Sequence, residues 1–268
     1  MKKQHPRTWR GGVSALSAVL VVTAACQDGS VARPELPATT TAGNALSMMN
    51  SAAPFQAWHQ GFNHGTGGWI GSETAGPGGW CGTIEARSTG DGPLAPSAGS
   101  GYAVVRHGPC NDYWAGAFPA GSGPYSPGAG YGTAWPEGGW VAQLDVYLDP
   151  GQVGEGETLF TLAASVDLLQ EGEFHYFFVP VTGTSDGLSV DGIRVTDAGW
   201  YTFRHVFSDE DGALRDTFEL ARGQQVMGSS STDTGLDPAD VSSGYLWFVA
   251  IKDGVDLPID EHRVRRGG

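Results

Sequence analysis

Two carboxylates and an imidazole lie within five residues, in the segment Glu171-Gly172-Glu173-Phe174-His175. In a β-strand, alternate positions share one face, so Glu171, Glu173 and His175 would converge there. Hydrolysis of a glycosidic bond uses two carboxyl groups, one of which has a raised pKa. The same residues also fit a polar turn that leads into a buried aromatic strand. The segment therefore offers three weak catalytic candidates and no complete catalytic set.

A second region, residues 111–139, is nearly free of charge and dense in Gly, Pro and aromatic residues. A long loop of this kind is either functional or disordered, and so many aromatic residues argue against disorder. Aromatic faces stack well on sugar rings, so we expect any sugar to bind on the face that this loop borders. The alternative is that the rings fold back over a sheet edge. The candidate ligand-binding residues are Tyr113, Trp114, Tyr125, Tyr131 and Trp135.

Other kinds of site have little support in the sequence. Beyond the first 25 residues the histidines are scattered, and no cysteine lies at the spacing of a zinc site. His205 falls in an apolar stretch, where we expect a hydrogen-bonded core residue. There is no G-x-S-x-G motif, and the G-x-G stretches lack the context of a phosphate loop. We therefore expect no cofactor.

The N-terminus is typical of an export signal. Residues 1–10 carry four basic side chains and no acid, and the apolar residues 13–25 are too few to span a bilayer permanently. The segment Thr23-Ala24-Ala25-Cys26 resembles the lipobox of bacterial lipoproteins, although Thr23 stands where Leu is usual. That resemblance implies cleavage before Cys26 and a lipid on its sulfur. The alternative is an ordinary signal peptide with an incidental cysteine.

This interpretation divides the chain into three parts. Residues 1–25 are a signal peptide, 26–54 a flexible tether rich in Ala, Thr, Ser and Pro, and 55–268 a single folded domain. The protein would be exported and held on a bacterial membrane through its lipid alone. With Cys26 lipidated, Cys81 and Cys110 remain, and an oxidising compartment favours a disulfide between them. We expect the short strands 82–88 and 101–107 beside them to be adjacent.

Composition excludes several classes of protein. Without residues 1–25 the chain has 11 basic and 29 acidic residues, a formal charge of about −18. Binding to nucleic acid needs clustered Lys and Arg, so a nucleic-acid partner is not expected. The 42 glycines mark many turns, whereas the aromatic content argues against a disordered chain.

Alternation of apolar and polar residues predicts an all-β fold. Residues 140–149 place apolar side chains at every even position, and residues 200–207 place Tyr201, Phe203, His205 and Phe207 on one face. Residues 209–212 then form a polar turn into a strand at 214–220. No helical segment separates the strands, so we predict a sandwich of two packed antiparallel sheets.

Three segments resemble concanavalin A-like lectin/glucanase domains, which are jelly rolls. They are residues 62–69 with the F…G…GW start, residues 199–207 with GWYTFRHVF, and residues 257–260 with the closing L.ID strand. The stretch 123–149 is similar to uncharacterised secreted proteins. The resemblance implies the jelly-roll fold and a structural calcium ion, with Asp260 as its weak candidate ligand. The fold hosts lectins, glycosidases and lyases alike, so it does not choose among them.

Three functions remain open at this point. The favoured hypothesis is a non-catalytic carbohydrate-binding lipoprotein of the cell envelope. The second is a polysaccharide hydrolase or lyase, although the E-x-D-x-x-E pattern of jelly-roll glucanases is not matched here. The third is a structural envelope protein without a small ligand.

Overall fold

The computed structural model describes residues 57–66, 69–71, 82–107, 117–119, 135–168 and 173–267. All of them belong to one unit of the chain, residues 32–268. These ranges hold strands and two short 3-10 turns, Pro150–Gln152 and Pro238–Asp240. No helix among them is long and apolar enough to cross a membrane.

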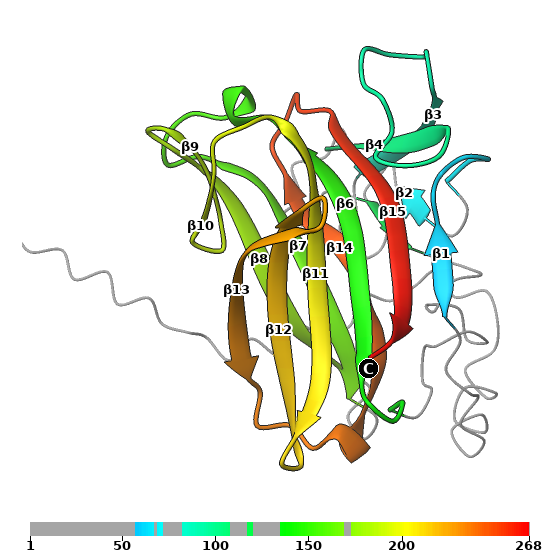
Figure 1. The fold of residues 1–268 in the computed structure, drawn as a ribbon, viewed down its shortest axis with the longest axis vertical. Coiled ribbons are helices and arrows are strands. Elements are labelled where there is room, and N and C mark those ends of the chain that lie inside the picture. The colour runs from blue at the N-terminus through cyan, green and yellow to red at the C-terminus, as the bar shows by residue number, and fades with distance from the viewer. Residues whose placement is uncertain are drawn as a thin grey trace, which may run out of the picture. The chain divides into compact units, whose positions relative to one another are not determined.

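The larger sheet has eight strands in the order β13-β12-β11-β6-β15-β4-β3, with β1 paired to β15 as well. All of its pairs are antiparallel. Figure 1 shows β12, β11, β6 and β15 as long neighbouring strands. The strands are β1 (Trp58–Gln60), β3 (Gly82–Ser88), β4 (Gly101–His107), β6 (Trp140–Leu148), β11 (Gly199–Glu210), β12 (Ala213–Arg222), β13 (Gln225–Asp233) and β15 (Leu257–Arg266).

The smaller sheet has five antiparallel strands in the order β10-β9-β8-β7-β14 and lies behind the larger one in Figure 1. A separate pair joins β2 (Trp69–Gly71) to β5 (Ala117–Pro119). The strands of the smaller sheet are β7 (Thr158–Leu168), β8 (Glu173–Thr184), β9 (Gly187–Val190), β10 (Ile193–Val195) and β14 (Val241–Ile251).

The core lies between the two sheets, and the predicted two-sheet antiparallel sandwich is confirmed. Rings from opposite sheets meet there, with Phe160 5.8 Å from Phe203 and Phe177 5.2 Å from Phe207 between centroids. The alternation predicted for the strand at 140–149 is also confirmed, because its even-numbered apolar side chains are all fully buried: Trp140, Ala142, Leu144, Val146 and Leu148. Burial of such side chains supplies the main favourable term in folding.

Two tight turns set the register of the strands that carry the candidate site. The β11–β12 turn has φ of 56° at Asp211 and 82° at Gly212, and the β9–β10 turn has 48° at Asp191 and 81° at Gly192. Positive φ at both central residues is typical of a type I′ hairpin, which Asp-Gly favours. The polar turn predicted at residues 209–212 is therefore confirmed, and it fixes which residues of β11 and β12 lie opposite one another.

The strands 82–88 and 101–107 are antiparallel partners, as the sequence predicted, and Gly82 lies opposite His107. The beginning of β3 and the end of β4 therefore lie at the same end of this strand pair. Both cysteines lie outside the described residues, so their disulfide stays a prediction.

Candidate functional site

A pocket of about 200 Å³ lies at the edge of the sandwich where β8 faces β11, β12 and β13. β8 pairs with β9 only through Val181–Thr184, so the earlier part of β8 has no strand on that side among the described residues. We call this space the inter-sheet pocket. It is lined by His175, Tyr176, Phe177, Phe178, Val179, Asp191, His205, Asp216, Phe218, Ser230 and Thr232.

Strand register explains why polar side chains gather on one wall of the pocket. His205 lies opposite Phe218 and Phe218 opposite Ser230, while Asp216 lies opposite Thr232. Residues directly opposite one another in antiparallel strands share a face of the sheet. The imidazole, the carboxylate and the two hydroxyls therefore all lie on the face that looks toward the smaller sheet.

His205 and Asp216 form a buried pair on this wall. His205 Nδ1 lies 2.9 and 3.1 Å from the two carboxylate oxygens of Asp216, and the residues are only 1% and 4% exposed. A carboxylate only accepts hydrogen bonds, so Nδ1 donates, and in the neutral form of the ring Nε2 is left as an acceptor. Nε2 is buried and has no hydrogen-bond partner in the part of the chain that the structure describes. Unpaired buried polar atoms are rare because they cost free energy.

His175 brings a second imidazole to the pocket from β8. Burial lowers its pKa below the usual value, and the nearby charge of Asp216 offsets this only in part. The His175 ring is therefore neutral at pH 7. A neutral imidazole can donate one hydrogen bond and accept another, so it can serve a polar ligand without adding charge.

Aromatic rings complete the walls. Phe177 lies 5.0 Å from His175 and Phe218 lies 5.3 Å from His205, between ring centroids. Phe178 also lines the pocket and is 48% exposed, so its ring surface is available from solvent.

The β9–β10 turn is fastened to β13 beside the pocket. Ser230 Oγ donates a hydrogen bond to Asp191, and Ile193 packs so closely on Gly228 that a Cβ there would lie 2.9 Å from its side chain. Asp191 thus keeps a carboxylate at the pocket, and the two sheets are held together at this edge.

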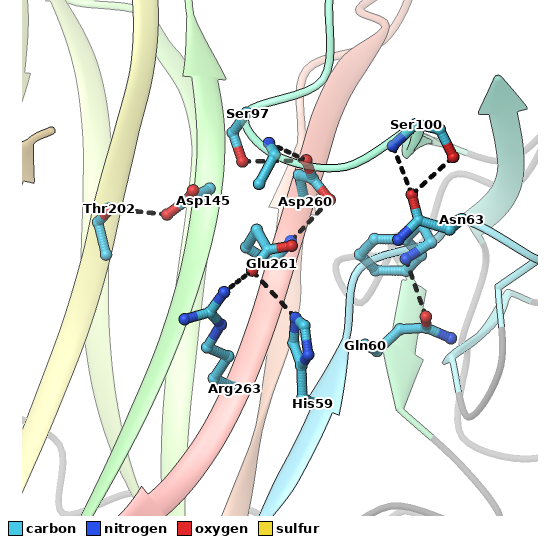
Figure 2. A network of polar contacts seen from close by, with 12 residues as sticks. His59, Gln60, Asn63, Ser97, Ser100, Asp145, Thr202, Asp260, Glu261 and Arg263 are labelled. Atoms are coloured by element: carbon cyan, nitrogen blue, oxygen red, sulfur yellow. Dashed lines mark hydrogen bonds and ion pairs between the residues drawn. The ribbon is translucent and has the colours of Figure 1, made fainter. Parts of the chain in front are cut away.

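A second cluster lies on the opposite face of the larger sheet, away from the core. Thr202, Asp145 and Asp260 are aligned across β11, β6 and β15, and Thr202 Oγ1 donates to Asp145 at 2.6 Å (Figure 2). We refer to these residues as the outer network, together with His59, Ser97, Ala98, Glu261 and Arg263.

Asp260 is the centre of the outer network. Its Oδ2 accepts hydrogen bonds from Ser97 Oγ at 2.9 Å and Ala98 N at 3.1 Å, and its Oδ1 accepts one from Glu261 N at 2.8 Å. The side chain is fully buried, and that burial raises its pKa to about 6 against the opposing effect of these hydrogen bonds. Burial also raises the pKa of Asp145.

Glu261 ties the N-terminal strand to the same network. Its carboxylate lies 3.0 Å from His59 Nε2 and also pairs with Arg263 (Figure 2). Both oxygens of Asp260 are already used, and the described residues include no group of three or more His, Cys, Asp or Glu arranged for a metal ion. Calcium at Asp260 stays a prediction, and the network as it stands fastens β1 and the 97–98 segment to the sheet.

The residues predicted as catalytic are only partly described. Glu171 lies outside the described residues, and Glu173 begins β8 without a described side chain. His175 lies on β8 in the inter-sheet pocket. The structure therefore brings His175 beside the His205–Asp216 pair, a grouping that the sequence did not suggest.

Of the predicted ligand-binding aromatics, only Trp135 is described. It is partly buried and packs against the core, and its Nε1 has no described hydrogen-bond partner. For this ring the arrangement matches the alternative, in which the loop folds back on the sandwich. Four other aromatic candidates and the lipidation site lie outside the described residues: Tyr113, Trp114, Tyr125, Tyr131 and Cys26.

Sequence reasoning missed Asp216, Ser230 and Thr232. A signal for Asp216 was present, because Leu214, Asp216, Phe218 and Leu220 alternate on β12 and one member of this apolar series is charged. The hydrogen-bonded core role expected of His205 is confirmed by its contact with Asp216. Ser230 and Thr232 lie in a polar strand, and only the register with β12 reveals them.

The fold defines the protein as an antiparallel β-sandwich. No family model and no curated protein sequence matches the chain. Two solved structures are similar: arcelin-5, a lectin-like defence protein from Phaseolus vulgaris, and the CBM2 module of the evolved Dit of Lactobacillus casei BL23 phage J-1.

The chain is 9% identical to arcelin-5 with a TM-score of 0.36, over 78% of this chain and 96% of that one. It is 12% identical to the CBM2 module with a TM-score of 0.31, over 77% and 93%. Scores of this size do not establish a shared fold, so the fold assignment rests on the strand pairing.

Proposed function

We propose that this protein is an exported, lipid-anchored envelope protein whose β-sandwich binds carbohydrate in the inter-sheet pocket without cleaving it. The lipid on Cys26 would be its only membrane attachment, and the tether would hold the sandwich away from the membrane surface. We also propose that the sandwich is a concanavalin A-like jelly roll.

The observation that carries the proposal is the combination of groups in the pocket. Aromatic rings at Phe177, Phe178 and Phe218 lie beside the carboxylates of Asp191 and Asp216. A sugar presents apolar C–H faces and a rim of hydroxyls, so it uses both kinds of contact at once. Small-molecule sites are in general apolar pockets with a few placed polar groups.

An enzyme is the competing candidate, and one observation favours it. A histidine whose Nδ1 donates to a buried carboxylate has an Nε2 that can take a proton from a substrate. The pocket also holds the hydroxyls of Ser230 and Thr232, but Ser230 already donates to Asp191. Turnover of a bound glycan would therefore favour the hydrolase or lyase alternative.

A glycan array probed with the full-length Cys26→Ser chain tests the binding function. Phe178→Ala should weaken every positive signal, since this ring lines the pocket and is 48% exposed. Val226→Ala is the matched control, because Val226 is 49% exposed and lies on β13 outside the pocket lining. No signal on the array, or equal losses in the two variants, would contradict the proposal.

Export and anchoring have a separate test. Mass spectrometry of the wild-type protein from the membrane fraction should find a mature N-terminus at a diacylated Cys26. An intact Met1, or cleavage elsewhere with an unmodified cysteine, would contradict this part of the proposal and leave carbohydrate binding untouched.

A further inference from the structure

The unpaired nitrogen of His205 restricts what the pocket can bind. Nδ1 donates to Asp216, so in the neutral form of the ring Nε2 is a hydrogen-bond acceptor, at a residue that is 1% exposed. A buried acceptor is satisfied only by a hydrogen-bond donor. A ligand that fills the pocket must therefore bring an O–H or N–H group to this nitrogen.

The charge of the pocket excludes a second group of ligands. Among the described residues, its lining includes the carboxylates of Asp191 and Asp216 and neither Lys nor Arg. His175, which lines the pocket beside the pair, is neutral at pH 7 because burial lowers its pKa. Like charges brought together without a counter-charge oppose binding. Uronic acids, sialic acids and sulfated sugars are therefore poor ligands for this site.

The size of the pocket limits how much of a ligand enters. Pockets for drug-sized ligands have about 300–1,000 Å³, whereas this one has about 200 Å³. That space suits one sugar ring. Because the pocket lies at the sandwich edge, between β8 and β13, the rest of a glycan would remain in solvent.

We infer that the inter-sheet pocket recognises a single uncharged sugar unit at the end of a glycan, with one of its hydroxyls donating to His205 Nε2. This inference rests on the proposed carbohydrate-binding function and adds its ligand class. Phe177 and Phe218 flank the two imidazoles and offer apolar surface to the ring, and Ser230 and Thr232 lie near its hydroxyls.

Calorimetric titration of the full-length Cys26→Ser chain tests the ligand class. The probes are the methyl glycosides of glucose, galactose and mannose, the matching uronic acids, and oligosaccharides that end in the best neutral unit. We expect one neutral glycoside to bind at least about tenfold more tightly than its uronic acid. An oligosaccharide should bind with an affinity similar to that of its terminal unit alone.

Variants separate the roles of the imidazole and the charge. His205→Phe removes the acceptor and should lower affinity for the neutral glycoside roughly tenfold. Asp216→Asn keeps an oxygen for Nδ1 but removes the charge, so the neutral glycoside should still bind while the uronic acid gains affinity. Glu219→Gln is the matched control, because Glu219 lies on the outward face of β12 and pairs with Arg204.

A second measurement uses the wild-type protein and does not depend on variants. The ¹⁵N resonances of His205 should show a protonated Nδ1 and a bare Nε2, and saturating glycoside should shift Nε2 toward a hydrogen-bonded value. A proton on Nε2 in the free protein would overturn the inference.

The outcomes distinguish a failure of the inferred ligand class from a failure of the proposed carbohydrate-binding function. Equal or tighter binding of the uronic acids, or binding of oligosaccharides only through internal units, would overturn the ligand class while carbohydrate binding stands. Failure of every neutral and acidic probe and of the glycan array would overturn the proposed function itself.

Discussion

The inter-sheet pocket and the outer network both bury an aspartate beside polar partners, yet they satisfy it differently. In the outer network Asp260 accepts three hydrogen bonds from Ser97, Ala98 and Glu261. In the pocket Asp216 binds His205, whose second nitrogen has no partner among the described residues.

The difference separates a structural role from a binding role. A buried carboxylate that accepts several hydrogen bonds stabilises the segments that supply its donors. An unpaired buried nitrogen destabilises the ligand-free protein. That cost is removed when a ligand supplies the missing donor, and this favours binding. Variants in the two regions should therefore affect different properties.

The largest effect is expected for His205→Phe. An aromatic ring is kept, but the Asp216 carboxylate, which is 4% exposed, loses its only described hydrogen-bond partner. Breaking a buried pair by removing one partner costs about 3–5 kcal/mol of stability. Urea denaturation of the variant should show this loss, and the double variant His205→Phe/Asp216→Leu should recover most of it. A single variant as stable as wild type would end the argument for a tightly coupled pair.

Asp260→Ala should cost less stability and leave binding unchanged. Three donors lose their acceptor, but Ser97 is only half-buried and Ala98 is exposed, so water can replace part of the lost hydrogen bonding. We expect a loss of about 2–3 kcal/mol in urea denaturation. Affinity for the best neutral glycoside should stay at the wild-type value. A large loss of affinity in a folded variant would mean that the outer network takes part in binding.

The pH dependence of stability gives a smaller effect. The folded pKa of Asp260 is about 6, above its usual value of 3.8, so between these values the folded state holds a proton that the unfolded chain has released. This carboxyl therefore stabilises the fold most below about pH 4, and its contribution falls as pH rises through 6. The stability difference between wild type and Asp260→Asn should shrink from pH 4 to pH 6.5. A difference independent of pH would contradict the raised pKa.

His262 has the opposite effect on the pH dependence of stability. The measurement therefore uses the difference between the stability curves of wild type and Asp260→Asn. Its burial lowers its pKa to about 3, and its Nδ1 accepts a hydrogen bond from Trp69 Nε1 at 2.9 Å. The unfolded chain binds the extra proton below about pH 6.5, so this residue makes stability fall as pH falls. Wild type and Asp260→Asn both contain His262, so its effect cancels in the difference between them.

The smallest stability effect is expected for Thr232→Val on the edge strand β13. Thr232 is exposed, and it lies opposite Asp216 on β12 in the strand pairing, which the substitution leaves in place. Surface changes of this kind usually stay within about 0.5 kcal/mol. Affinity for the neutral glycoside should nevertheless fall measurably, since the hydroxyl lines the pocket. Thr217→Val, on the outward face of β12, is the control and should leave affinity unchanged.

Much of the sandwich could be predicted from the sequence. The buried faces of residues 140–148 and 201–207 follow from period-two alternation, and the Asp211-Gly212 hairpin follows from its residue types. These features are local, so neighbouring residues contain the whole signal.

The candidate site could not be predicted in the same way. Asp216 and Ser230 meet His205 only because β11, β12 and β13 pair in one register, and His175 joins them from the other sheet. Packing between sheets is not encoded in any short window of residues. The Glu171/Glu173 segment drew attention because its carboxylates are close in sequence. The pocket instead joins His175 to His205, Asp216, Ser230 and Thr232, which lie 30 to 57 positions further along the chain.

The place of β15 has a consequence for folding. Residues 257–266 pair with β4, β6 and β1, which lie 100 residues or more earlier in the chain. Synthesis from the N-terminus delivers this strand late, and until then β4 and β6 have unpaired edges. Open edges invite pairing with other chains, so the incomplete polypeptide is most prone to aggregate during that interval. The docking of β15 is therefore the folding step with which pairing between chains competes most directly.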